Sequence, residues 1–174
     1  MDELVETDDT RTAMWLPGHA LNCYVGDAQL RSWLLTPGLL TQRFRDSCGA
    51  KFRVKRLPER LVGNERWREV GMYCGDTIWV FARTRFPLVT LAAAPWLAEI
   101  GDTPLGEAVA AHGGVARTEF EYSELGPHHD VIAAALRHAR LAPQSLWARR
   151  SVFEVANQVF LLQEVFLPHV GRDA

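Results

Sequence analysis

The amino-acid sequence predicts an α+β fold in which a mostly antiparallel sheet is covered on one side by helices. Two pairs of alternating apolar segments are each joined by a short turn, as in β-hairpins. Segments with the spacing of amphipathic helices precede these pairs and lie between them. Runs of strands and helices that do not alternate strictly are typical of an antiparallel sheet with helices packed on it.

The first predicted elements are two helices that form a hairpin near the N-terminus. Asp27 can cap the first helix, which runs to Leu35. Thr36 and Pro37 then open the second helix, because proline is favoured at a first helical position. Gly49 ends it.

The middle of the chain predicts three strands. Residues 51–57 alternate between polar and apolar side chains, which indicates a strand with one solvated face. Residues 67–74 and 78–86 flank the turn at 75–77 and form the first predicted hairpin. Pro87 ends its second strand.

The C-terminal half predicts helices and strands in turn. Thr103 is a suitable N-cap with Pro104 at the first helical position, and glycines 113 and 114 end that helix. The remaining predicted elements are a strand, a helix and a final hairpin, at residues 115–122, 130–141, and 146–155 with 159–167.

Length and composition are those of an ordinary globular protein. The 174 residues, 48% hydrophobic with a formal net charge of −2, predict one domain spanning 1–174, with 1–25 as a loosely ordered N-terminal segment. The arginines are scattered, so no nucleic-acid partner is expected. No apolar run reaches the roughly 18 residues of a membrane span. We therefore expect a cytoplasmic monomer without a membrane partner.

The cysteines and histidines give no support for a disulfide framework or a metal site. Three cysteines are an odd number and lack the Cys-x-x-Cys spacing, so each is expected to be a small, buried or half-buried residue. Adjacent histidines do not easily face one ion, and no carboxylate or cysteine spacing completes a ligand set. No phosphate-binding glycine motif or nucleophile elbow is present either, so no cofactor is expected.

Two charged residues lie on apolar strand faces. Glu164 shares a face with Phe160, Leu162 and Phe166, where an unpaired carboxylate would be strongly disfavoured. Arg68 shares a face with the apolar residues of its own strand. The two residues form either a buried salt bridge or the two ends of a polar-lined pocket, and the pattern leaves both interpretations open.

Six sequence blocks, in order between about residue 30 and residue 168, resemble those of the bacterial chorismate pyruvate-lyases, which make 4-hydroxybenzoate for ubiquinone. The blocks are Leu34-Leu35-Thr36 with Leu40-Thr41-Gln42-Arg43-Phe44, Trp67-Arg68-Glu69-Val70, Trp79 with Phe81-Ala82-Arg83-Thr84, Thr103-Pro104-Leu105-Gly106, Trp147-Ala148-Arg149-Arg150-Ser151, and Leu161 to Pro168.

The resemblance implies a ligand pocket buried beneath helical flaps, with chorismate as substrate and neither metal nor organic cofactor. The ligand-binding arginine of the family corresponds to Arg68 and its glutamate to Glu164, while main-chain contacts correspond to Leu40 and Leu105. Leu40 replaces a frequent methionine, which matters little for a main-chain contact. The segment between 122 and 146 is longer than in short members of the family, which bears on specificity and product release.

Chemistry assigns provisional roles to the matched residues. Arg68 would pair with the ring carboxylate through its planar donor fork, and Glu164 would lie at the hydroxyl end, either to transfer a proton or only to hold the ligand. Arg83 is a candidate for the enolpyruvyl carboxylate or an ordinary structural arginine. The competing functions are a non-catalytic binding module for aromatic acids and a structural domain with an Arg68–Glu164 salt bridge.

Overall fold

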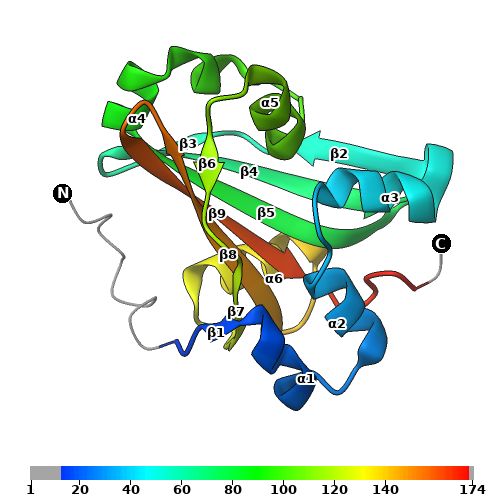
Figure 1. Cartoon of the computed structure of the whole chain (residues 1–174). Helices are drawn as coiled ribbons and strands as arrows, with labels where there is room; N and C mark the ends of the chain where they lie inside the picture. The colour runs from blue at the N-terminus through cyan, green and yellow to red at the C-terminus, as the bar shows by residue number, and fades with distance from the viewer. Residues whose placement is uncertain (1–12, 173–174) are drawn as a thin grey trace.

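The computed structural model describes residues 13–172, and its centre is one antiparallel sheet (Figure 1). In the described residues the sheet has nine strands, in the order β1-β7-β8-β9-β5-β4-β2, with β3 paired to β4 and β6 to β8. The strands are β1 (Leu16–Pro17), β2 (Phe52–Arg56), β3 (Arg60–Val62), β4 (Glu65–Cys74), β5 (Thr77–Pro87), β6 (Ala116–Arg117), β7 (Glu121–Leu125), β8 (Leu146–Val155) and β9 (Gln158–Phe166).

The helices are short and lie around this sheet. They are α1 (Leu21–Tyr24), α2 (Ala28–Leu34), α3 (Leu40–Cys48), α4 (Leu88–Ala93), α5 (Leu105–His112) and α6 (Asp130–Ala139), with 3-10 turns at Gly18–Ala20, Gly49–Lys51 and Pro95–Glu99. The predicted α+β class with an antiparallel sheet is therefore confirmed.

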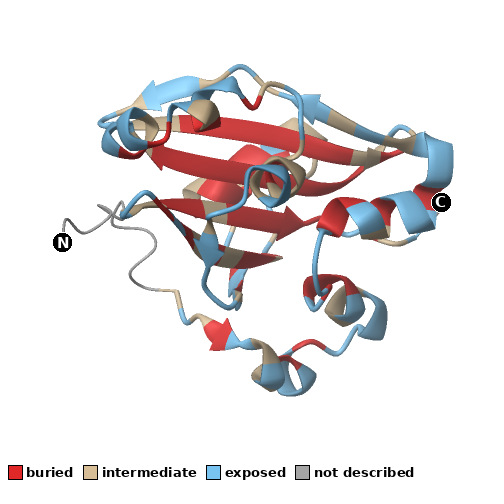
Figure 2. Ribbon diagram, turned by 45° about the horizontal axis from the view of Figure 1, so that its top comes forward, coloured by how far each residue is buried: buried red, intermediate tan, exposed pale blue. Residues whose placement is uncertain are grey.

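Both predicted hairpins are present and are joined at the middle of the sheet. β4 pairs with β5 and β8 pairs with β9, while β9 also pairs with β5 in a register that sets Ala82 opposite Glu164. Buried residues concentrate on these central strands (Figure 2). Because alternate side chains point to opposite faces, the register decides which residues of four strands share one face.

Helices cover both faces of the sheet, not one. Helices α3 and α5 lie on the same side, next to each other, whereas α6 packs on the other side (Figure 1). Val131 and Ile132 of α6 belong to the same apolar cluster as Phe81 and Val165 of the sheet. The hydrophobic spacing of residues 130–141 predicted the helix correctly, but the spacing carries no information on which face it covers.

Local differences from the predicted elements occur around turns. Helix α3 begins at Leu40 instead of Thr36–Pro37, because Gly38 has a positive φ of 68° that interrupts the helix geometry. The strand predicted at 115–122 is divided into β6 and β7. Residues 1–12 of the segment expected to be loosely ordered lie outside the described residues, but 16–24 form β1, a 3-10 turn and α1, with Leu21 fully buried.

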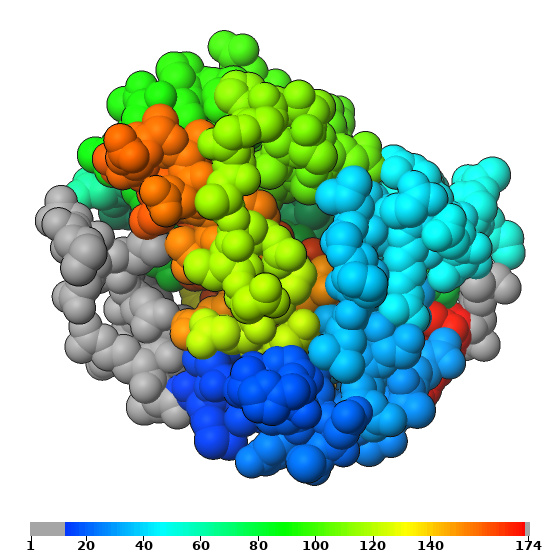
Figure 3. All heavy atoms as spheres, in the orientation of Figure 1, coloured from blue at the N-terminus to red at the C-terminus, as the bar shows by residue number. Residues whose placement is uncertain are grey.

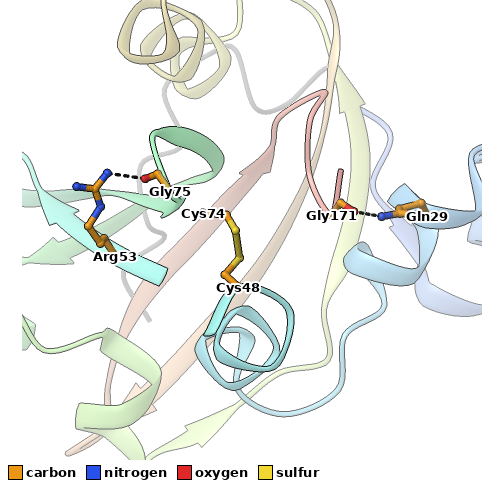
Figure 4. Close-up of a disulfide and its surroundings, with 6 residues drawn as sticks. All are labelled: Gln29, Cys48, Arg53, Cys74, Gly75 and Gly171. Atoms are coloured by element: carbon orange, nitrogen blue, oxygen red, sulfur yellow. Dashed lines mark hydrogen bonds between the residues drawn. A yellow bond between two sulfur atoms is a disulfide. The ribbon is translucent and has the colours of Figure 1, made fainter. Parts of the chain in front are cut away.

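The expectation of three unpaired cysteines is wrong. Cys48 at the end of α3 and Cys74 at the end of β4 form a disulfide, with Cα atoms 5.6 Å apart (Figure 4). Cys23 is free but exposed, so the expectation that it is buried or half-buried is also wrong. Spacing rules address cysteines that are close in sequence, whereas these two are separated by 26 positions and meet only because α3 packs over the start of the β4–β5 turn.

Candidate active site

A cavity of about 310 Å³ lies between the sheet and the segments that carry α3 and α5. Its base consists of one face of β4, β5, β9 and β8, and its cover comes from residues 38–41 and 104–110. Figure 3 shows the surface hollowed between α3 and the segment from α5 to β6. The size suits one small organic molecule, since ligand pockets begin at roughly 300 Å³.

The base of the cavity is mostly apolar and has a polar group at each of two places. On β4, the period of two brings Arg68 to the same face as Val70 and Met72. The same alternation brings Glu164 to this face of β9 beside Leu162. The structure thus brings together the two anomalous charges of the sequence.

Arg68 is buried without a carboxylate partner among the described residues. Its side chain is 3% exposed, and its Nη2 donates to the carbonyl oxygens of Gly101 at 3.1 Å and Thr103 at 2.9 Å. Its Nε is buried with no hydrogen-bond acceptor in the described part of the chain. Burial lowers the pKa of Arg68 from its ordinary value. A buried guanidinium without a carboxylate partner favours binding of an anion, which would balance its charge.

Glu164 is paired with Arg149 and not with Arg68. The Nε of Arg149 donates to Glu164 Oε2 at 2.5 Å, and both side chains are buried. The alternative of an Arg68–Glu164 salt bridge is therefore wrong, and the two residues mark separate polar ends of one cavity.

Arg149 is a site residue that the sequence reasoning did not select. Its Nη1 donates to the carbonyl oxygens of Leu34 at 3.0 Å and Thr36 at 3.3 Å, in the turn that leads to α3. It faces Glu164 across the β8–β9 pairing. Because side chains alternate along β8, only one of Arg149 and Arg150 can point inward, and the need of Glu164 for a partner is the signal that could have selected Arg149.

Leu40 and Leu105 line the cavity from the two covering segments. These segments touch each other. A Cβ atom at Gly106 would lie 2.8 Å from Leu39 Cδ2, so a larger residue at this position would require the Leu39 side chain to move. Beside it, Arg45 Nη2 of α3 lies 2.7 Å from Glu107 Oε1 of α5. The two segments together cover the cavity in part, and the hollow between α3 and the segment from α5 to β6 leaves it open to solvent.

Arg83 does not line the cavity. Because it follows Ala82, which does, its side chain points to the other face of the sheet. There its Nη2 lies 2.7 Å from Glu69 Oε1, and its Nη1 donates to Asp130 Oδ2 at 2.8 Å. Its guanidinium also lies 4.3 Å from the ring centroid of Trp67. Arg83 has the environment of a structural arginine.

Three kinds of feature are absent from the described part of the chain or from the cavity lining. Among residues 13–172, no group of three or more histidine, cysteine, aspartate or glutamate side chains is arranged to hold a metal ion. Within the same range, no helix has the length and apolar character needed to cross a membrane. The longer segment between 122 and 146 contributes no lining residue to the cavity.

The fold and the cavity are those of a protein with space for one small molecule between two covering segments and a mostly apolar sheet face. The family described as chorismate lyase matches residues 10–172. A relative from Nitrosospira multiformis, named "Probable chorismate pyruvate-lyase", is 35% identical over 80% of this chain and 87% of its own length. One from Thiobacillus denitrificans with the same name is 34% identical over 88% of both chains. The chain belongs to the chorismate lyase family of enzymes.

Two solved structures with a similar fold have much lower sequence identity to this chain. The ligand-binding domain assigned to a GntR-family transcriptional regulator from Bordetella bronchiseptica is 9% identical, with a TM-score of 0.48, over 68% of this chain and 87% of that one. A transcriptional regulator of the GntR family from Enterococcus faecalis is 11% identical, with a TM-score of 0.39, over 68% of this chain and 91% of that one. These likenesses carry no argument about function.

Proposed function

We propose that this protein is a chorismate pyruvate-lyase that converts chorismate into 4-hydroxybenzoate and pyruvate for ubiquinone biosynthesis. The observation that carries the proposal is the buried guanidinium of Arg68, which lines a mostly apolar cavity and has no carboxylate partner among the described residues. Membership of the chorismate lyase family supports it.

The reaction needs little chemical machinery. Chorismate carries a ring carboxylate, an enolpyruvyl ether and a hydroxyl on the neighbouring carbon. The C–H bond at the hydroxyl-bearing carbon breaks and its electrons enter the ring, while the ether C–O bond breaks and releases enolpyruvate, which takes up a proton to become pyruvate. Aromatisation drives the step, so the enzyme has mainly to orient the substrate, exclude water and manage one proton.

Arg68 would hold the ring carboxylate. Two of its carbonyl contacts, at Gly101 and Thr103, lie just before the covering segment that contains Leu105. A carboxylate would take the buried Nε, which has no acceptor within the described residues. Guanidinium recognition of a carboxylate supplies both energy and orientation, so the ring would be fixed at this end of the cavity.

Glu164 would lie at the hydroxyl-bearing carbon. Its carboxylate, held in place by Arg149, would accept either the hydrogen bond of the hydroxyl or the ring proton. One position of the carboxylate serves either role, because the carbon that carries the hydroxyl is also the carbon that loses the proton. The main chain at Leu40 and Leu105 would lie over the ring, since both residues line the cavity from its covering segments.

The proposal is tested by incubating the purified protein with chorismate and quantifying pyruvate together with the hydroxybenzoate isomers against an enzyme-free control. We expect equimolar pyruvate and 4-hydroxybenzoate. If chorismate is not consumed while 4-hydroxybenzoate still raises the melting temperature, the protein is a binding module for aromatic acids. If neither occurs, the cavity has another ligand.

The role of Glu164 is tested with Glu164→Gln, which keeps the shape and removes the charge. We expect kcat to fall by roughly 100-fold or more, the effect typical of losing a group that handles a proton. The affinity for 4-hydroxybenzoate, measured by calorimetry, would stay within several-fold. Near-normal turnover would instead leave Glu164 as a residue that only positions the ligand.

A further inference from the structure

The charged side chains that line the cavity do not match a ligand with a single carboxylate. They are Arg68, Arg117, Arg149 and Glu164, so the formal net charge of the lining is +2. The substrate in the proposed function carries two carboxylates, one on the ring and one on the enolpyruvyl group. Arg68 accounts for the first, and the second requires another cation close to the Glu164 end, where the ether is attached.

Arg149 is not available for this second carboxylate. Its Nε is engaged by Glu164 and its Nη1 by two backbone carbonyl oxygens. Removing it from Glu164 would leave a buried carboxylate without its partner, which is strongly unfavourable. Arg83 lies on the other face of the sheet. Of the arginines that line the cavity, Arg117 is the one left to consider.

Arg117 lies at the exposed margin of the cavity, on β6 opposite Phe153 of β8. Its guanidinium is 4.0 Å from the ring centroid of Phe120, and the guanidinium of Arg149 is also 4.0 Å from that centroid. Phe120 thereby connects Arg117 with the Arg149–Glu164 pair. Within the described part of the chain, no carboxylate forms an ion pair with Arg117, so stacking on Phe120 holds its charge in place without neutralising it.

We propose that Arg117 binds the enolpyruvyl carboxylate of the substrate and so selects a dicarboxylate over a monocarboxylate. This inference rests on the proposed lyase function. It replaces Arg83 in the role that the sequence suggested for that residue. Because Arg68 is buried and Arg117 is exposed, the ring carboxylate enters the closed end and the enolpyruvyl group stays at the margin. Pyruvate then leaves before the aromatic product.

The test compares three stable ligands that differ only next to the hydroxyl: 4-hydroxybenzoate, 4-hydroxy-3-methoxybenzoate, and 3-(carboxymethoxy)-4-hydroxybenzoate. The second carries an ether without a carboxylate, and the third adds the carboxylate. Their affinities are measured by calorimetry for the native protein, Arg117→Gln, Arg117→Lys and Arg137→Gln. Arg137 is an exposed arginine on α6, across the sheet from the cavity, so its substitution is the matched control for loss of one charge.

We expect Arg117→Gln to weaken binding of the dicarboxylate about fivefold, the upper end of the range for a solvent-exposed charge pair. Binding of the two monocarboxylates should change less than about twofold, as should all three affinities in Arg137→Gln. Arg117→Lys should retain part of the dicarboxylate preference, because it keeps the charge without the planar donor fork. With chorismate, Arg117→Gln should raise KM more than it lowers kcat.

Two results would overturn the assignment. One is an equal loss of affinity for all three ligands in Arg117→Gln, which would mean that the residue only supports the shape of the cavity. The other is an unchanged preference for the dicarboxylate. These outcomes are independent of turnover: a native protein that makes no pyruvate from chorismate would refute the lyase function, while the ligand comparison would still decide what Arg117 binds.

Discussion

The two faces of the sheet both bury arginines, but only one face supplies each of them with a carboxylate. On the face covered by α6, Arg83 contacts Glu69 and Asp130, and Arg85 contacts Glu65. On the cavity face, Arg68 has only backbone carbonyl partners and a buried Nε without one, within residues 13–172. The same strands supply both faces. Neighbouring residues of β4, such as Arg68 and Glu69, therefore belong to different environments.

The presence or absence of a carboxylate partner separates arginines that stabilise the fold from arginines that can bind an anionic ligand. The charge of a buried cation with a carboxylate nearby is balanced inside the fold. Removing that cation destabilises the protein, because it leaves the carboxylate buried without a partner. A buried cation without one keeps its attraction for an outside anion and adds nothing comparable to stability. Burial alone did not distinguish Arg68 from Arg83, because both are nearly fully buried.

The largest expected effect is on the face covered by α6. Arg83→Met should lower the free energy of unfolding by roughly 3 to 5 kcal/mol, the usual cost of removing one partner from a buried pair. Chemical denaturation measures this change. Arg53→Met is the control, since Arg53 pairs with Asp76 on the surface and should cost at most about 1 kcal/mol. Equal losses in the two variants would contradict the structural role of Arg83.

On the cavity face, Arg68→Met should act on binding instead of folding. We expect the affinity for 4-hydroxybenzoate to fall by about 2 to 5 kcal/mol, the cost of truncating one member of a buried charge pair. The free energy of unfolding without ligand should stay within about 1 kcal/mol or rise, because an unpaired buried charge is removed. Calorimetry and denaturation measure the two quantities, and unchanged affinity would remove Arg68 from the site.

A smaller effect concerns pH and His138, which lies on the α6 side with its Nε2 2.8 Å from the hydroxyl of Tyr73. Burial, with Lys55 nearby, lowers the pKa of His138 from its ordinary value of 6.5. The unfolded chain therefore binds a proton first as the pH falls below about 6.5, and stability decreases until the folded form is protonated too.

Melting curves between pH 8 and pH 5 check this effect. His138→Gln should lose less stability over that interval than the native protein, and His169→Gln, at an exposed histidine, is the matched control. A native protein and a His138→Gln variant with parallel pH curves would show that His138 does not contribute. Because His138 is remote from the cavity, 4-hydroxybenzoate affinity should be the same in both proteins.

The smallest expected effect is at the contact between the covering segments. Arg45 and Glu107 are partly exposed, at 45% and 27%, so their ion pair should contribute no more than about 1 kcal/mol to closure. Arg45→Gln should therefore speed release of 4-hydroxybenzoate by a few-fold in stopped-flow measurements and leave the unfolding free energy nearly unchanged. A release rate equal to that of the native protein would mean that the Leu39–Gly106 contact alone keeps the cover closed.

The sequence determined the elements of the fold and the first residues of the site. Hairpin turns and alternation gave β4–β5 and β8–β9 with nearly correct bounds, because these signals depend on residues close together in the chain. Arg68 and Glu164 were evident as charges on apolar strand faces, and the family blocks added Leu40 and Leu105, all four of which line the cavity.

The tertiary structure decided which of these charges meet. The pairing of β5 with β9 and of β8 with β9 set Arg149, not Arg68, against Glu164, and the placement of α6 gave Arg83 its partners across the sheet. The disulfide between Cys48 and Cys74 depended on the same kind of contact. Strand register and helix placement arise from packing between segments distant in sequence, so local patterns in the chain do not specify them.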